Sequence, residues 1–162
     1  MATLLLFIGF TKQASAQSDT LHYFPPLHNT YSAANGAEEQ FLYVATSDPG
    51  PVNVTITDGA GNLVLTQAIT PTTPIEYNVE LHAGTLDNSV MMTQVGELST
   101  VLTDKGLIIT SDKKTTASFR VKDSNQGDIL TSKGAGGSVG TTFRAGGNII
   151  DVNGGSYNFF LS

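Results

Sequence analysis

The sequence predicts an all-β protein, built as an antiparallel β-sandwich. Short apolar or alternating segments recur along the chain, and Gly, Pro, Asn and Asp separate them. Charged residues make up only 14% of the 162 residues, a composition that suits an extracellular β-protein better than a helical enzyme. The length is that of one domain, and it suffices to bury a core although the chain has no cysteine to form disulfides.

The first part of the chain predicts an extended lead-in segment at 17–40, followed by a β-sandwich domain at 41–162. Pro25 and Pro26 favour extended backbone, because proline fixes φ and disfavours helix in the residue before it. Residues 41–46 form a continuous apolar run, which predicts a strand buried on both faces. A turn at 48–51 follows this run.

The clearest local pattern is a hairpin. Val52, Val54 and Ile56 alternate with polar residues, as in a half-buried strand. Glycines within 58–61 permit a tight reversal, and 62–66 return as the partner strand.

The rest of the chain predicts further strands and their connections. They are a one-sided strand at 75–81, a short helix or turn across one end of the sheet at 90–102, a buried strand at 106–110, a turn at 112–114, a one-sided strand at 115–122, a glycine-rich connector at 132–140, a short strand at 141–144, and a hairpin at 148–152 and 156–161. Because proteins avoid exposed apolar strand edges, we expect this chain to be the N-terminal fragment of a longer multi-domain protein, truncated within the β-sandwich.

Residues 1–16 have the pattern of a secretory signal peptide. An apolar run at 3–10 precedes Ala14 and Ala16, which occupy the two small-residue positions of a cleavage site. No Lys or Arg precedes the run, so we expect either a start codon farther upstream or a clipped chain; a buried strand or short core helix is the alternative interpretation. The run is about half of the ~20 apolar residues that cross a bilayer. Export would place the mature chain in the extracellular space or on the outer cell surface, without a membrane span.

The charge of the chain argues against one class of partner. Removal of Lys12 with the signal peptide leaves 14 acidic and 7 basic residues (8 − 1), so the formal net charge changes from −6 to −7. Because proteins bind the nucleic-acid backbone through Lys and Arg, we expect no nucleic-acid partner.

No arrangement of residues predicts catalysis, a cofactor or a metal site. Lys133 precedes the glycines of the connector, whereas a phosphate-binding loop has its lysine after them. Residues 123–128 are rich in oxygen ligands but lack a closing glutamate, so we favour an ordinary turn over a calcium site. We expect the three histidines, His22, His28 and His82, at the surface.

Aromatic side chains are the best candidates for contact with a ligand. The candidates for stacking on sugar rings or on a partner domain are Tyr23, Phe24, Tyr31, Tyr157 and Phe160. The alternative interpretation is core packing, or docking to C-terminal domains of the same chain.

Two parts of the sequence resemble a known family. Residues 105–112 (KGLIITSD), leading into 117–121 (ASFRV), and the later segment 140–144 (GTTFR) resemble motifs of the IgGFc-binding-protein N-terminal family. The segment at 23–27 and the hairpin at 52–65 resemble versions found in large Bacteroidetes cell-surface proteins, which often carry gliding-motility-associated or type IX secretion domains. The resemblance implies a non-catalytic extracellular β-module, and it transfers no catalytic residue. The chain lacks the cysteines of the animal members, so IgG binding is not implied.

These observations give three hypotheses in order of preference. The first is a non-catalytic surface module of a secreted bacterial protein, acting in adhesion or scaffolding, without a cofactor. The second is a carbohydrate-binding module for mucin glycans, and the third is an enzyme domain. The expected partners are C-terminal domains of the same chain and host or extracellular glycans or proteins.

Overall fold

A computed structural model describes residues 18–28, 39–79, 90–93, 95–97, 100–123, 126–135, 148–150 and 156–158. The expected signal peptide with Ala14 and Ala16, and the aromatic residues Tyr31 and Phe160, lie outside these ranges. The elements are β1 (Asp19–Phe24), β2 (Leu27–His28), β3 (Glu39–Ala45), β4 (Val52–Asp58), β5 (Leu63–Ile69), β6 (Ile75–Asn78), β7 (Met92–Thr93), the 3₁₀ turn η3 (Val95–Glu97), β8 (Leu107–Asp123), β9 (Gln126–Thr131), β10 (Asn148–Ile150) and β11 (Ser156–Asn158).

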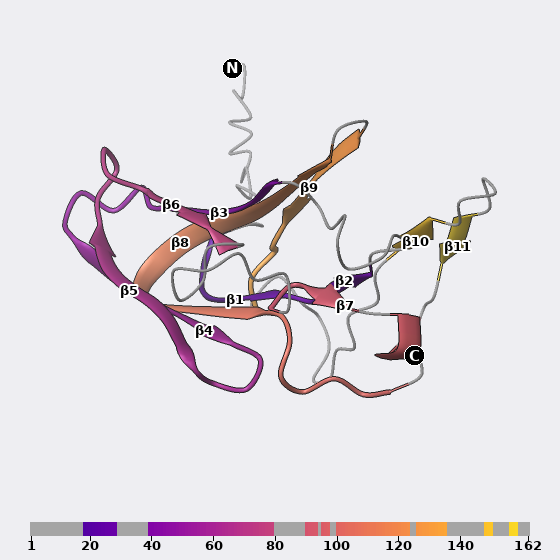
Figure 1. Ribbon diagram of the computed structural model, residues 1–162. Coiled ribbons are helices and arrows are strands. Elements are labelled where there is room, and N and C mark those ends of the chain that lie inside the picture. Colours follow the sequence, from indigo (N-terminus) through magenta and orange to yellow (C-terminus); the bar gives the residue numbers. More distant parts are fainter. Residues whose placement is uncertain are drawn as a thin grey trace, which may run out of the picture.

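Seven of these strands form one antiparallel sheet around β8. The strand order is β5-β4-β8-β3-β6, and β1 and β9 also pair with β8. The first half of β8 pairs with β1 and β4, and its second half pairs with β3 and β9. Figure 1 shows β8 curving between a lower limb with β1, β4 and β5 and an upper limb with β3, β6 and β9, which gives a nearly closed, barrel-like sheet. The all-β, antiparallel part of the prediction is confirmed.

The turn expected at 112–114 is wrong, because β8 runs through these residues as a single strand of 17 residues. The three charged side chains lie where the strand passes from one limb to the other. Asp112 accepts hydrogen bonds from the backbone N–H (2.9 Å) and the side-chain Nδ2 (2.7 Å) of Asn53, and Lys113 forms an ion pair with Asp48 (3.0 Å). The bend of β8 places these charged side chains beside polar partners at the surface. A cluster of charged residues, which is common in turns, therefore lies here within a strand.

The predicted hairpin at 52–66 is confirmed by the antiparallel pairing of β4 and β5. Val52, Val54 and Ile56 are all fully buried in the core. Asp58 closes the turn, since its carboxylate accepts hydrogen bonds from the backbone N–H (2.8 Å) and Nδ2 (2.9 Å) of Asn62. Gly61 adopts φ = 88°, a conformation that favours glycine.

Strand β3 is buried on one face only, which corrects the expectation of two buried faces. Leu42 and Val44 are fully buried, whereas Phe41 and Tyr43 lie half-buried on the outer face. The continuous apolar run concealed an alternating strand, because its outward positions carry aromatic rather than polar residues.

The remaining predictions have mixed outcomes. Residues 75–78 form β6 as expected, and β10 pairs with β11 as the expected final hairpin. A short helix or turn was expected at 90–102; the described part contains a turn at Val90 and Met91, then β7 and the 3₁₀ turn η3. The part of the lead-in segment that the structure describes at 18–28 contains β1 and β2, as an extended segment would, and β1 joins the main sheet.

Candidate functional site

Strand β1 directs its side chains alternately into the core and out to solvent. Phe24 is only 3% exposed and packs against Phe119, with ring centroids 6.0 Å apart, so of the two interpretations core packing is the one that applies to Phe24. Tyr23, the next residue along the strand, is 55% exposed on the outer face. Tyr157 lies on β11, and its side chain is outside the described set.

His22 is fully buried, which corrects the expectation of a surface histidine. Its Nε2 lies 3.0 Å from the carbonyl oxygen of Thr115 and 3.2 Å from that of Asp19, so this nitrogen carries the proton and donates it. Its Nδ1, 3.1 Å from Ser132 Oγ, therefore accepts a hydrogen bond from the Ser132 hydroxyl. The Ser132 oxygen also accepts the backbone N–H of Gly134 (3.2 Å). A histidine–serine pair that is closed off in this way joins β1, β8 and the segment after β9, and it exposes no imidazole to a substrate.

A second buried polar contact holds the start of β8. Lys105 Nζ donates to the carbonyl of Met92 (2.7 Å) and forms an ion pair with Glu97 Oε2 (3.1 Å), and the lysine side chain is only 9% exposed. Both partners belong to the short elements β7 and η3. The contact therefore anchors these elements to the sheet.

The most distinctive exposed feature is on the outer face of the lower limb. Strand register places Tyr23 opposite Ile108, Ile108 opposite Thr57, and Thr57 opposite Leu63. Because directly opposed residues of antiparallel strands share a face, these four side chains form one row. Leu63 is 61% exposed at the far end of the row.

A second row runs beside the first. It contains Leu21, Thr110, Thr55 and Thr66 by the same register. None of the eight residues in the two rows carries a charge, although the chain has a formal net charge of −6. We call this surface the uncharged outer face, formed by Leu21, Tyr23, Thr55, Thr57, Leu63, Thr66, Ile108 and Thr110.

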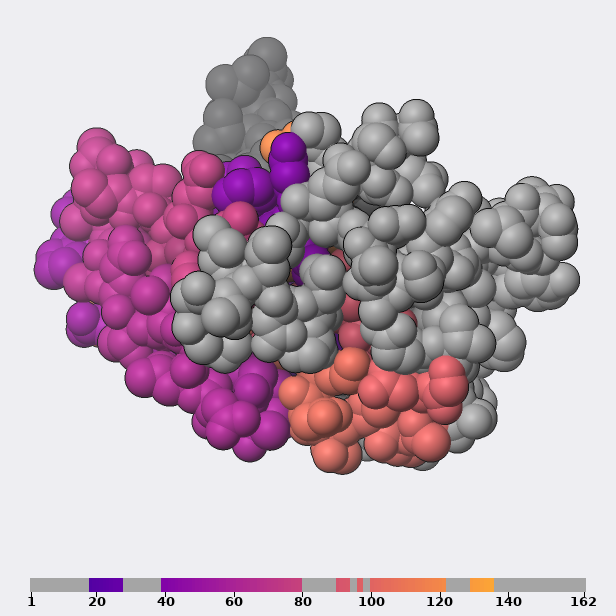
Figure 2. Space-filling view, in the orientation of Figure 1, coloured from indigo at the N-terminus to yellow at the C-terminus, as the bar shows by residue number. Residues whose placement is uncertain are grey.

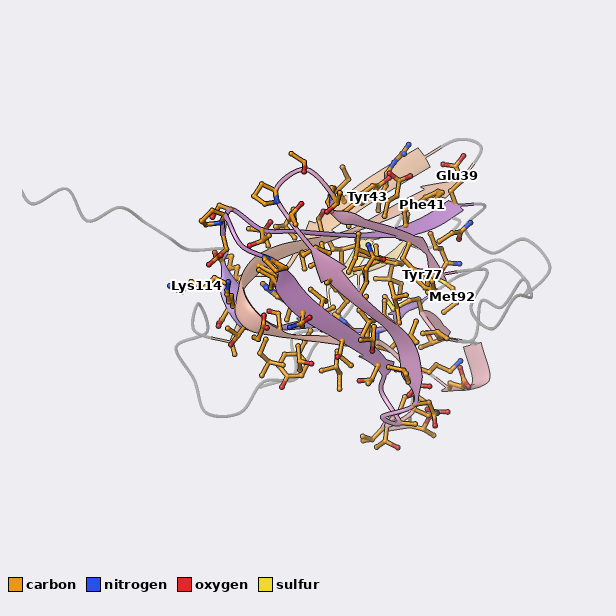
Figure 3. The ribbon with its side chains drawn as sticks, turned by 90° about the vertical axis from the view of Figure 1, so that its left-hand side faces the viewer. Glu39, Phe41, Tyr43, Tyr77, Met92 and Lys114 are labelled. Carbon is orange, nitrogen blue, oxygen red and sulfur yellow. The ribbon has the colours of Figure 1, made fainter. Side chains whose placement is uncertain are left out.

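The upper limb presents a different outer surface. Phe41 and Tyr43 lie side by side on β3, with ring centroids 6.2 Å apart. Register places Arg120 opposite Phe41 and Glu76 opposite Tyr43, so this surface carries both signs of charge. Figure 3 shows Phe41 and Tyr43 beside Glu39 along β3, on the opposite side of the view from Lys114 at the bend of β8. We call Phe41 and Tyr43 the aromatic pair; the sequence analysis missed this surface feature because it assigned both residues to a doubly buried strand.

Among the described residues, no group of three or more His, Cys, Asp or Glu side chains could hold a metal ion. No helix in the described part of the chain is long and apolar enough to span a membrane. Residues 53–55 (NVT) fit an N-glycosylation sequon. Its first residue, Asn53, is exposed on β4 and donates a hydrogen bond to Asp112. A turn was expected at 123–128; Asp123 is the last residue of β8 and lies opposite Gln126, the first residue of β9, while residues 124 and 125 lie outside the described residues.

Comparison with known proteins found no matching family model, no matching curated protein and no matching solved structure.

Proposed function

We propose that this chain is a non-catalytic, extracellular β-sandwich module of a bacterial surface protein, acting in adhesion or scaffolding, as the resemblance to the IgGFc-binding-protein N-terminal family implies. The signal-peptide pattern of residues 1–16 supports export. The two facing limbs of the bent sheet support a sandwich-type arrangement. Among the described hydrogen bonds, one brings together a nucleophile and a base, Ser132 and His22. These side chains join β1 to β8 and to the segment after β9, which is a structural role.

The uncharged outer face is the observation that carries this proposal. The solvent-facing side of an antiparallel sheet normally carries polar and charged residues. Here Tyr23 and Leu63 are more than half exposed, and the uncharged residues Ile108 and Thr57 fill the positions between them. Uncharged surfaces that expose aromatic and aliphatic side chains are typical of contact sites for other molecules.

An adhesion assay tests the proposal directly. Beads coated with the purified chain are expected to be retained under flow on surfaces coated with mucin or with extracellular-matrix protein. The double variant Tyr23→Ser/Leu63→Ser should lower retention severalfold. The matched control Tyr43→Ser alters the aromatic pair on the other limb and should retain wild-type adhesion. Retention no higher than that of albumin-coated beads on every surface would contradict adhesion, and turnover of a glycoside or peptide substrate library would contradict the non-catalytic assignment.

Carbohydrate binding, with mucin glycans as the ligand, is the second candidate. Tyr23 supplies an exposed ring that can stack on the apolar face of a sugar, and Thr57 and Thr110 place hydroxyl groups in and beside its row. Because the face carries no cation, it suits neutral glycans better than sialylated or sulfated ones.

A glycan array with titration of the positive glycans separates this candidate from protein adhesion. We expect neutral glycans to bind, Tyr23→Ala to lose binding, and Tyr23→Phe to keep it because the ring remains. An array that stays blank at high protein concentration would exclude the carbohydrate function while leaving protein adhesion in place.

A further inference from the structure

Among the strands that the structure describes, four strands of the seven-stranded sheet have a single neighbour, and three of them carry features that discourage pairing with another chain. Strand β6 has only four residues, one of which is Glu76, and Pro74 precedes it. The free side of β1 receives a hydrogen bond from the backbone N–H of Ala135 to the carbonyl of Leu21 (3.0 Å). Strand β9 carries Asp128, and Lys133 follows it closely. Short length, charge, proline and covering segments are the usual means of protecting an edge strand.

Within the part of the chain that the structure describes, strand β5 has none of these four protective features. Its seven residues, LVLTQAI, include no charge, no proline and no glycine. Among the described strands, β4 is its only partner. Thr66, Gln67 and Ala68 are all exposed, and the magenta atoms of this part of the chain lie at the surface in Figure 2. A segment of this length, with high β-propensity and no charge, is typical of a strand that pairs with another chain.

We propose that β5 pairs in an antiparallel orientation with β5 of a second copy of this chain. A twofold axis brings the same strand of each copy together, so one strand supplies both halves of the interface. Two copies that each carry a net charge of −6 repel one another over most of their surface. They meet without like charges at β5, and the outward threonines Thr55 and Thr57 of the adjoining β4 are also uncharged.

The geometry of β5 defines the part that pairs. The β4–β5 register is regular from Ile56 opposite Leu65 to Val52 opposite Ile69, and the bulge lies at its start, between Ile56 and Thr57. The flat part is therefore Leu65–Ile69, centred on Gln67. Gln67 lies opposite the buried Val54, so its side chain is on the inner side of the sheet at the open edge.

Because the chain has no cysteine, single-cysteine variants report this contact without background. Gln67→Cys, which lies on the twofold axis, and an equimolar mixture of Thr66→Cys and Ala68→Cys, which face each other across it, are expected to form disulfide-linked dimers under mild oxidation at a rate at least tenfold above that of Glu76→Cys on the edge of β6. Light scattering of the wild-type chain should give a dimer mass that falls to the monomer mass on dilution.

Charge at the edge provides the reciprocal test. Gln67→Lys places an inward-pointing charge on β5, a natural protection against edge pairing, and it should give a monomer with an unchanged far-ultraviolet circular dichroism spectrum. Tyr23→Ser leaves β5 intact and should remain dimeric, so loss of adhesion and loss of the dimer are separable. A wild-type chain that is monomeric at every concentration, or cysteine variants that all oxidise at the rate of Glu76→Cys, would overturn the proposal.

Discussion

Replacing His22 with phenylalanine tests whether the buried histidine holds β1 against β8. The variant keeps an aromatic ring of similar size in the same space and removes both ring nitrogens. The carbonyl of Thr115 then loses the Nε2–H donor at 3.0 Å, and the hydroxyl of Ser132 loses its acceptor. The Asp19 carbonyl keeps the bond from Thr115 Oγ1 (3.2 Å), so the Thr115 carbonyl is the acceptor most affected by the loss of the histidine donor.

The expected cost follows from these losses. A buried acceptor left without its donor costs about 1–3 kcal/mol, and loss of the bond from the half-buried Ser132 adds about 1 kcal/mol. The free energy of unfolding should therefore fall by about 2–4 kcal/mol. At about 2–4 °C per kcal/mol for a domain of this size, the melting temperature should fall by about 4–16 °C. If His22 were a surface residue, the change would lie within about 0.5 kcal/mol.

Urea denaturation of the wild-type chain, His22→Phe, Ser132→Ala and the double variant measures both the cost and its origin. A double-mutant cycle should give a coupling of at least about 0.5 kcal/mol between His22 and Ser132, because the two side chains are hydrogen-bonded. A loss below about 0.5 kcal/mol for His22→Phe, or strictly additive single substitutions, would refute the hydrogen-bond network as the element that fixes β1.

Three further predictions concern single positions. Gly134→Ala should lower the free energy of unfolding by at least about 2 kcal/mol, because φ is 72° and the new methyl group would collide with Cβ of Asp19. Gly61→Ala should cost only about 1 kcal/mol, because Gly61 has φ = 88° but open space around it. Equal losses of the two variants in denaturation experiments would contradict this difference. Burial raises the pKa of Tyr77 above its ordinary value of 10.0, so the contribution of Tyr77 to stability is present below pH 10.0 and is lost as pH rises through the higher folded-state pKa. Tyrosinate absorbance should show a late-titrating group that Tyr77→Phe removes. If that group persists in the variant, Tyr77 is excluded as its source. The hydrogen bond from Lys113, together with the one from the Gly50 N–H, lowers the pKa of Asp48 below 3.8. This carboxylate therefore stabilises the fold above pH 3.8, and its contribution disappears as pH falls through the lower folded-state pKa. Asp48→Asn should make the urea midpoint less sensitive to acid, and an unchanged acid dependence of the midpoint would contradict this assignment.

Local features of the fold could be predicted from the sequence. The β4–β5 hairpin was predictable because alternation, glycine placement and the partner strand all lie within residues 52–69. The alternation of 75–78 and the two runs of the final hairpin are local in the same sense. Such patterns depend on neighbouring residues, which a single sequence displays in full.

Features that depend on distant residues were missed. His22 follows a polar stretch and precedes two prolines, so its surroundings in sequence resemble a solvent-exposed segment. Its hydrogen-bond partners Thr115 and Ser132 lie 93 and 110 residues farther along the chain. The charges at 112–114 indicated a turn because the sequence does not show that Asn53 and Asp48 lie beside them.

The candidate site was predictable only in part, because an exposed face depends on register. Tyr23 was identified from the sequence, but its row also needs Ile108 and Leu63, which three separate strand pairings bring together. Phe24 was placed with the wrong group of residues, since neighbouring positions of one strand point to opposite faces. No single-sequence pattern reports which residue of a distant strand lies opposite another.

Strand β1 links the core to the candidate binding surface, because its side chains point alternately to the two. His22 and Phe24 point inward and fix the register of β1 on β8, while Leu21 and Tyr23 point outward from the same strand. A slip of one residue would exchange the two faces and remove Tyr23 from the row with Ile108. The register shift between Asp19 and Leu21 lies where the Asp19 carbonyl accepts bonds from His22 and Thr115, so the buried network stands at the point where β1 could slip. The uncharged outer face consequently depends on buried groups that lie beneath it, and His22→Phe should weaken the proposed adhesion through the position of Tyr23 even under conditions where the chain remains folded.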